Sequence, residues 1–147
     1  SKDSERLLLE SSRYVILKRF TSKEEKRRIV AAVFSPTDSY SKWLGLENHL
    51  NYIHRKNGKI PNTEALGLAA FLNSVIADRY FRAISGNTQI NAAEIREMPF
   101  PEEEDLVRIG SAIETMDKWT PVELEQIVAH ALNLPKKLIQ NLTESIR

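Results

Sequence analysis

Hydrophobic residues gather in two short runs near the start of the chain, and a polar, charged segment separates them. The runs cover residues 14–20 and 28–34, and both are rich in β-branched and aromatic residues, which favour strands. Residues 21–27 between them are too many for a tight turn, so the pattern predicts an antiparallel hairpin with a projecting connection. A third candidate strand covers residues 49–55 and is closed by an Asn-Gly turn.

From about residue 62 onward the hydrophobic positions recur at helical spacing. Residues 63–82 carry a wide apolar face, which predicts one long helix with Asn62 or Thr63 as its N-terminal cap. A short helix is expected after Asn91, whose side chain can cap it. The prolines within residues 98–101 keep the next stretch extended, because residues that precede proline avoid the helical region.

The last third of the chain predicts three more helices. Residues 102–118 place apolar side chains on one helical face. The next helix starts at Thr120 as cap, with Pro121 at its first position and Glu123 placed for a capping box. Pro135 opens the last amphipathic helix. Because strands come first and helices last, this order favours an α+β fold over a parallel doubly wound sheet.

We therefore expect antiparallel strands in the N-terminal half to pack on a central helix, followed by a helical C-terminal third. Residues 1–101 form the α+β region of this single domain, and residues 102–147 form a helical extension packed on it. Ser1 has no initiator methionine before it, the start has no secretory signature, and no apolar run approaches the ~18–20 residues of a membrane span. We expect a piece of a longer, cytoplasmic protein.

The composition excludes several kinds of site. The chain of 147 residues has no cysteine, which excludes disulfides, thiol nucleophiles and cysteine metal ligands. Its five glycines lie too far apart for a phosphate-binding loop, and its three histidines are not spaced as a metal site. No serine lies in a nucleophile elbow. We therefore expect no catalytic residue, no metal ligand and no bound cofactor in this chain.

The net charge of +1 hides two oppositely charged segments. Residues 13–28 hold seven basic against two acidic residues, a net charge of +5, whereas residues 94–125 hold three basic against ten acidic residues, a net charge of −7. Such runs commonly form solvated faces. Here the basic run lies on and between two predicted strands, and a hairpin with a basic tip can enter a DNA groove or follow phosphates. Nearby asparagine and glutamine side chains would add groups that read base edges.

Three segments of the chain carry a more specific signal. They are residues 14–34, residues 46–54 (Leu-Glu-Asn-His-Leu-Asn-Tyr-Ile-His) and residues 72–101, which contain Ser-Gly-Asn-Thr-Gln-Ile-Asn and end in Met-Pro-Phe-Pro. In this order they resemble the C-terminal target-recognition region of adenine-specific DNA methyltransferases of bacterial type II restriction–modification systems. Residues 72–101 also resemble, more loosely, the end of target-recognition domains in type I specificity subunits.

The resemblance implies a parent enzyme that transfers a methyl group from S-adenosylmethionine to adenine N6 in a specific duplex sequence. It implies double-stranded DNA and the enzyme's own N-terminal catalytic domain as partners. The catalytic domain of this family carries an (Asn/Asp/Ser)-Pro-Pro-(Tyr/Phe) motif that holds a flipped adenine. Because this chain has no Pro-Pro pair, it matches the recognition region and is not expected to bind the cofactor or to methylate DNA alone.

The candidate DNA contacts lie in the basic run, at the end of the long predicted helix and in the Asn-Thr-Gln-Ile-Asn stretch. They are Lys18, Arg19, Lys23, Lys26, Arg27, Arg28, Arg82, Asn87, Thr88, Gln89 and Asn91. Asn91 can instead cap the helix that follows it, and Arg82 can instead interact with the C-terminal end of its own helix.

Two other hypotheses remain open. Glu24 and Lys26 form a Glu-x-Lys sequence of the kind that metal-dependent nucleases use, although no partner acid is evident. Alternatively, the acidic helices at the C-terminal end dock on a partner subunit, and the chain is a protein–protein interaction module of a restriction–modification complex. This second hypothesis is compatible with DNA binding at the basic end.

Overall fold

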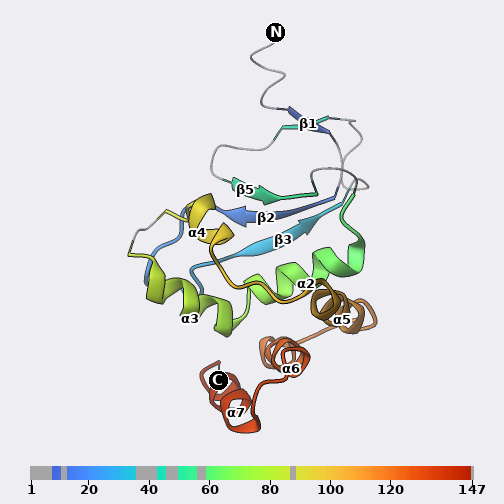
Figure 1. Cartoon of the computed structure of the whole chain (residues 1–147). Coiled ribbons are helices and arrows are strands. Elements are labelled where there is room, and N and C mark those ends of the chain that lie inside the picture. Colours follow the sequence, from blue (N-terminus) through green and yellow to red (C-terminus); the bar gives the residue numbers. More distant parts are fainter. Residues whose placement is uncertain are drawn as a thin grey trace.

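The computed structural model describes residues 8–10, 13–35, 43–45, 50–55, 59–86 and 89–146. The described strands are β1 (Leu8–Glu10), β2 (Tyr14–Lys18), β3 (Ala31–Phe34), β4 (Trp43–Gly45) and β5 (Leu50–Ile53). The described helices are α2 (Asn62–Leu72), α3 (Val75–Ile84), α4 (Ala92–Arg96), α5 (Glu103–Glu114), α6 (Pro121–Ala131) and α7 (Lys136–Glu144). The strands precede the helices along the chain (Figure 1), which confirms the predicted α+β class.

Strand β2 is the centre of a three-stranded antiparallel sheet in the order β3-β2-β5. Val15 of β2 lies opposite Val33 of β3 on one side and opposite Ile53 of β5 on the other. This register confirms the predicted hairpin and the third strand. A second antiparallel pair, β1 with β4, was not predicted, because each strand has only three residues and shows no readable alternation.

The predicted single helix over residues 63–82 is wrong, because two helices occupy this stretch. Between them, the Asn73 side chain makes two hydrogen bonds of 2.8 Å to the backbone of Ala31 in β3. Ser74 then caps α3, since its hydroxyl accepts from the Ala77 N–H at 3.2 Å. The predicted caps of α2 are also wrong: Pro61 takes the cap position, and no side chain caps this helix.

The remaining helices agree with the sequence pattern. Asn91 caps α4, and its Oδ1 accepts from the Ala93 N–H at 2.9 Å. Thr120 and Glu123 form the predicted capping box of α6, with hydrogen bonds of 3.1 Å in both directions. Pro135 precedes the first residue of α7. In the described part of the chain, no helix is long and apolar enough to cross a membrane.

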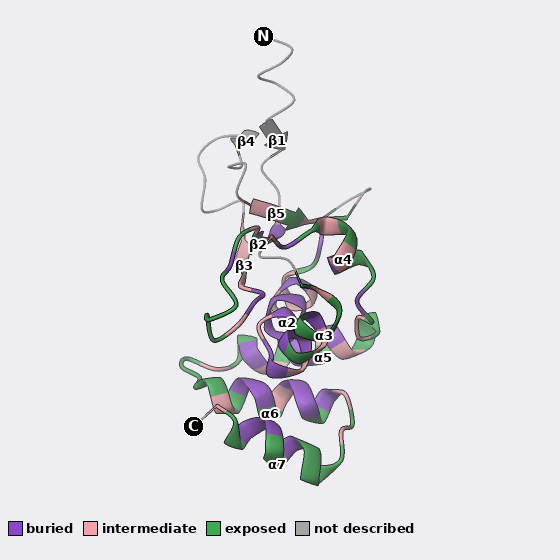
Figure 2. Ribbon diagram, turned by 90° about the vertical axis from the view of Figure 1, so that its left-hand side faces the viewer, coloured by how far each residue is buried: buried purple, intermediate pink, exposed green. Residues whose placement is uncertain are grey.

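Helix α2 is the centre of the hydrophobic core. Figure 2 shows that most of it is buried, whereas α6 and α7 keep exposed outer faces. It packs against the sheet on one side and against α5 on the other. A Cβ atom at Gly67 of α2 would overlap the carbonyl oxygen of Leu106, and one at Gly110 of α5 would overlap that of Thr63. The two helices therefore touch backbone to backbone.

Candidate nucleic-acid interface

The basic loop, which we define as residues 19–30, connects β2 to β3 and passes beside α3 (Figure 1). Lys23 and Lys26 are exposed on it, and Arg27 is half-buried. Lys18 is exposed at the end of β2, directly before the loop. These four cations therefore lie on or at the edge of one short segment of the surface.

Helix α3 holds the backbone of the basic loop through Arg82. Arg82 Nη1 donates to the Lys23 carbonyl oxygen at 2.8 Å, and Nη2 donates to the Glu25 carbonyl oxygen at 2.7 Å. The Nε–H of Arg82 donates to Asp78 Oδ2 at 2.9 Å. The guanidinium therefore faces the loop, and this positioning role was not predicted from the sequence, which suggested a phosphate contact or an interaction with the helix end.

Arg28 differs from the other cations of the loop, because it is only 2% exposed. Its backbone N–H donates to Asp78 Oδ1 at 2.7 Å, and its Nε donates to Thr21 Oγ1 at 3.3 Å. Its guanidinium carbon lies 5.7 Å from the centre of the Phe81 ring. The side chain of Arg28 is thus part of the support beneath the loop, and its contact with DNA stays a prediction.

Asp78 joins these two anchors, and removing it is expected to loosen the loop. Asp78→Ala leaves the buried Arg28 amide and the Arg82 Nε–H without their acceptor, which should cost about 2–4 kcal/mol of unfolding free energy. Urea denaturation measures this loss, with Asp117→Ala at an exposed position as the control. Equal midpoints for the two variants would contradict the anchoring role.

Gln89 and Arg19 lie side by side where the basic loop begins. Phe20 and Gln89 form an isolated antiparallel bridge, and the Ile90 N–H donates to the Arg19 carbonyl oxygen at 2.6 Å. With its amide oxygen turned toward the guanidinium, Gln89 accepts from Arg19 Nε and Nη2, both at 2.9 Å. The structure therefore brings this candidate from the Gly-Asn-Thr-Gln stretch to the basic run.

The other candidates of that stretch are placed differently. Asn87 and Thr88 lie outside the described residues. The side-chain oxygen of Asn91 is used as the cap of α4, so the capping alternative is confirmed. A DNA contact of Asn91 stays a prediction, and it is restricted to the side-chain nitrogen.

Glu125 of α6 is a buried carboxylate close to the basic loop that the sequence did not single out. It is 2% exposed, and its Oε2 accepts from the N–H of Val75, the first residue of α3, at 2.8 Å. Its Oε1 has no hydrogen-bond partner in the described part of the chain. Burial raises the pKa of Glu125, against the opposing effects of backbone hydrogen bonds from Val75 and Ile76 and of the Arg27 and Arg79 charges.

This raised pKa predicts a pH-dependent contribution to stability. The folded state binds the Glu125 proton more tightly than the unfolded chain does, so in the pH range above about 4.5 this contribution falls as the pH rises. Glu125→Gln keeps an oxygen for the Val75 N–H and removes the titration. We expect the variant to gain stability relative to the parent chain from pH 4.5 to pH 7 in urea denaturation. Parallel pH profiles would contradict this.

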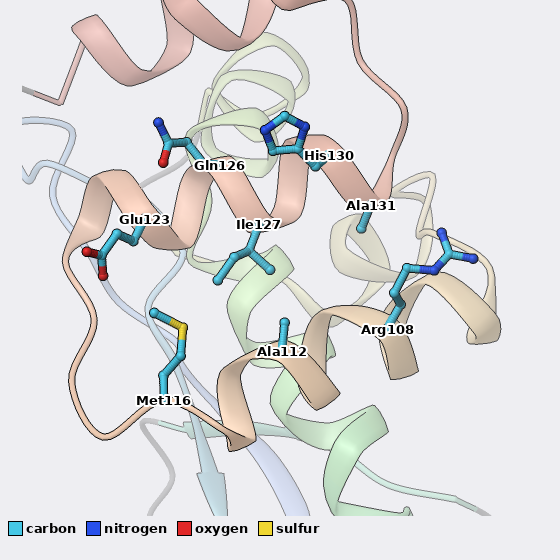
Figure 3. A pocket seen from close by; sticks show the side chains of 8 residues that line it. All are labelled: Arg108, Ala112, Met116, Glu123, Gln126, Ile127, His130 and Ala131. Atoms are coloured by element: carbon cyan, nitrogen blue, oxygen red, sulfur yellow. The ribbon is translucent and has the colours of Figure 1, made fainter.

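Helices α5 and α6 enclose a groove of about 490 Å³ at the acidic end of the chain. Figure 3 shows Ala112 and Met116 of the α5 side and Ile127 of α6 pointing into the space between the two helices. The polar residues that line the groove are Arg108, Glu123, Gln126 and His130. The groove thus combines an apolar floor with a mixed polar rim.

The Glu-x-Lys sequence of the nuclease hypothesis lies on the exposed part of the basic loop, at Glu24 and Lys26. Within the described stretches, no three histidine or acidic side chains lie close enough together to hold a metal ion.

Two curated relatives match most of this chain. The Type II methyltransferase M.BsuBI of Bacillus subtilis is 43% identical over 122 residues, which are 82% of this chain and 24% of the relative. The Type II methyltransferase M.PstI of Providencia stuartii is 34% identical over 128 residues, which are 87% of this chain and 25% of the relative. No protein-family model and no solved structure matches. The chain spans about a quarter of the length of these relatives and is homologous to that part of the type II methyltransferases.

Proposed function

We propose that this chain is the DNA-recognition part of a site-specific adenine-N6 DNA methyltransferase of a restriction–modification system. The homology to type II methyltransferases supports the enzyme class. The observation that carries the recognition role is the basic loop, in which Lys23, Lys26 and Arg27 extend from a backbone that Arg82 and Asp78 hold on α3. A loop held in one shape presents cations to phosphates at a low cost in conformational entropy.

The proposed interface has two parts with different tasks. The four cations Lys18, Lys23, Lys26 and Arg27 contact phosphates, which provides affinity without sequence information. Arg19 and Gln89 at the start of the loop are of the types that read guanine and adenine edges bidentately in the major groove. In the complex, their mutual hydrogen bonds would be exchanged for hydrogen bonds to bases.

The parent enzyme would use S-adenosylmethionine, which supplies the methyl group. This chain has no Pro-Pro pair of the kind that holds the flipped adenine, and its five glycines lie too far apart for a glycine-rich cofactor loop. We therefore assign cofactor binding and methyl transfer to the remaining part of the parent enzyme. That part, an N-terminal catalytic domain, is the second proposed partner beside duplex DNA.

Salt dependence distinguishes positioning residues from phosphate contacts in this interface. Arg82→Ala should weaken duplex binding about tenfold, because the loop loses two backbone anchors, and it should leave the slope of log K against log salt unchanged. Lys26→Ala removes one phosphate contact and should reduce that slope by about 0.9. Fluorescence anisotropy of a labelled duplex, titrated at several salt concentrations, measures both quantities.

One variant tests whether Arg82 positions the loop, and the other tests whether Lys26 contacts phosphate. A reduced slope for Arg82→Ala would mean that its guanidinium contacts phosphate and does not position the loop. Unchanged affinity and slope for Lys26→Ala would remove Lys26 from the interface.

The groove between α5 and α6 supports a second candidate function, docking on a partner subunit. Its apolar floor is of the kind that receives a side chain or helix of another protein. Ala112→Glu would place a charge on this floor and should abolish capture of the catalytic domain, whereas duplex binding should persist. Capture that survives this substitution would reject the groove as the docking site.

A further inference from the structure

Phe20 is the most exposed large hydrophobic side chain in the described part of the chain, at 50%. A single exposed phenylalanine is common on protein surfaces and needs no explanation by itself. Phe20 differs because it lies at the start of the basic loop, directly after Arg19, and forms an antiparallel bridge with Gln89. The base and phosphate contacts proposed above do not include this ring.

The backbone on both sides of Phe20 is held in place. Before it, the Arg19 carbonyl oxygen accepts from the Ile90 N–H at 2.6 Å, and the Asn51 side chain donates to the Ile90 carbonyl oxygen at 2.8 Å. After it, Thr21 is buried, and its hydroxyl donates to a carbonyl oxygen of the same loop at 2.6 Å. The exposed ring therefore starts from a fixed backbone, and contact with a ligand would require little ordering of the chain.

The ring of Phe20 lies beside the guanidinium of Arg19. The guanidinium carbon is 5.8 Å from the ring centre, a distance at which an aromatic face attracts a cation. Successive base pairs of DNA are about 3.4 Å apart, so the separation of guanidinium and ring is longer than one step and shorter than two. When Arg19 contacts a guanine, the ring of Phe20 therefore lies at the neighbouring base pair.

The major groove offers one apolar group to such a ring. All four bases present hydrogen-bond donors or acceptors there, and only thymine adds a methyl group, at C5. The phenylalanine side chain forms no conventional hydrogen bond with the polar edges, whereas its contact with the thymine methyl is a known mode of base recognition. Burial of one methyl group against the ring corresponds to about fourfold in affinity.

We propose that Phe20 is a specificity-determining residue that contacts the C5-methyl group of a thymine next to the guanine that Arg19 contacts. This inference rests on the proposed recognition function and narrows it, because the target must then contain thymine and guanine in adjacent base pairs. Arg19 provides the hydrogen bonds to guanine, and Phe20 provides the apolar contact to thymine. The exposed cations of the loop add affinity that does not depend on sequence.

Selection of duplexes from a randomised library by this chain identifies the two positions. Arg19→Ala should lose the preference for guanine at one position. Phe20→Ala should lose the preference for thymine at the position beside it and should keep the preference for guanine. Selection without any sequence preference would overturn the recognition function together with this inference. Selection of guanine without a neighbouring thymine would overturn this inference alone.

Removal of the methyl group from the selected duplex tests the contact directly. Uracil in place of that thymine lacks only the methyl group, and fluorescence anisotropy measures the affinity for both duplexes. We expect the parent chain to bind the uracil duplex about fourfold more weakly, and Phe20→Ala to bind both duplexes equally. At the same position, 5-methylcytosine should bind more tightly than cytosine to the parent chain, but not to Phe20→Ala.

Two further variants serve as controls. Leu138→Ala removes an exposed apolar side chain of α7, away from the basic loop, and should keep the fourfold difference. Phe20→Leu keeps an apolar side chain and should keep part of it. Equal binding of the thymine and uracil duplexes by the parent chain overturns the proposal, and so does a loss of affinity in Phe20→Ala that is the same for both duplexes. The salt dependence of binding should not change in any of these variants, so the phosphate contacts of the loop are tested separately.

Discussion

Replacing Gly110 with alanine is expected to separate α5 from α2 and to reduce the free energy of unfolding by more than about 3 kcal/mol. The added Cβ would overlap the carbonyl oxygen of Thr63, which is backbone and has no rotamer with which to move away. The same argument applies to Gly67→Ala, whose Cβ would overlap the carbonyl oxygen of Leu106. Because each glycine faces the backbone of the other helix, either substitution should disturb the same contact.

Urea denaturation followed by circular dichroism measures this effect. The matched control is Gly86→Ala, because a Cβ at Gly86 meets no atom within 4 Å. We expect the control to remain within about 0.5 kcal/mol of the parent chain. If Gly110→Ala unfolds at the same urea concentration as the control, the two helices do not touch as described.

Removal of three cations from the basic loop should have the largest effect on DNA binding. The combined change Lys23→Ala, Lys26→Ala and Arg27→Ala is expected to weaken duplex binding by about 100- to 1,000-fold at low salt. The slope of log K against log salt should fall by about 2.7, since each lost phosphate contact contributes about 0.9. Arg28 is not included, because its removal would damage the support of the loop.

The control for this experiment removes exposed positive charge elsewhere. Lys136 and Lys137 are exposed at the start of α7, outside the basic loop. Lys136→Ala with Lys137→Ala should change the slope little. Equal losses from both sets of substitutions would show that binding follows net charge and does not depend on the loop.

The sequence pattern was sufficient where a local signal acts on neighbouring residues. Alternating and β-branched runs predicted β2 and β3, and the Thr120–Glu123 capping box appears as expected. The pattern failed at residues 73–74, where α2 ends and α3 begins. Asn73 ends the first helix by binding the backbone of β3, and a hydrogen bond to a distant strand leaves no local pattern.

In the candidate site, too, the sequence predicted the local features but not the contacts between distant residues. The positive charge of the loop was visible from composition, and so was its place between two strands. The composition did not show which of these cations face solvent and which are buried. Arg27 and Arg28 are adjacent and identical in type, yet Arg28 is buried and Arg27 is not. Asp78 accepts the Arg28 amide from 50 positions away, and only the folded chain brings that carboxylate beneath the loop.

The sequence by itself determined the α+β class, most of the elements and the segregation of charge, because propensity, periodicity and capping act over a few residues. The tertiary structure decided which cations face solvent, how Arg82 and Asp78 hold the loop, and where the carboxylate of Glu125 comes to lie beside Arg27. These features depend on burial and on hydrogen bonds between distant segments, and such contacts form only when α3 and α6 come to lie beside the loop.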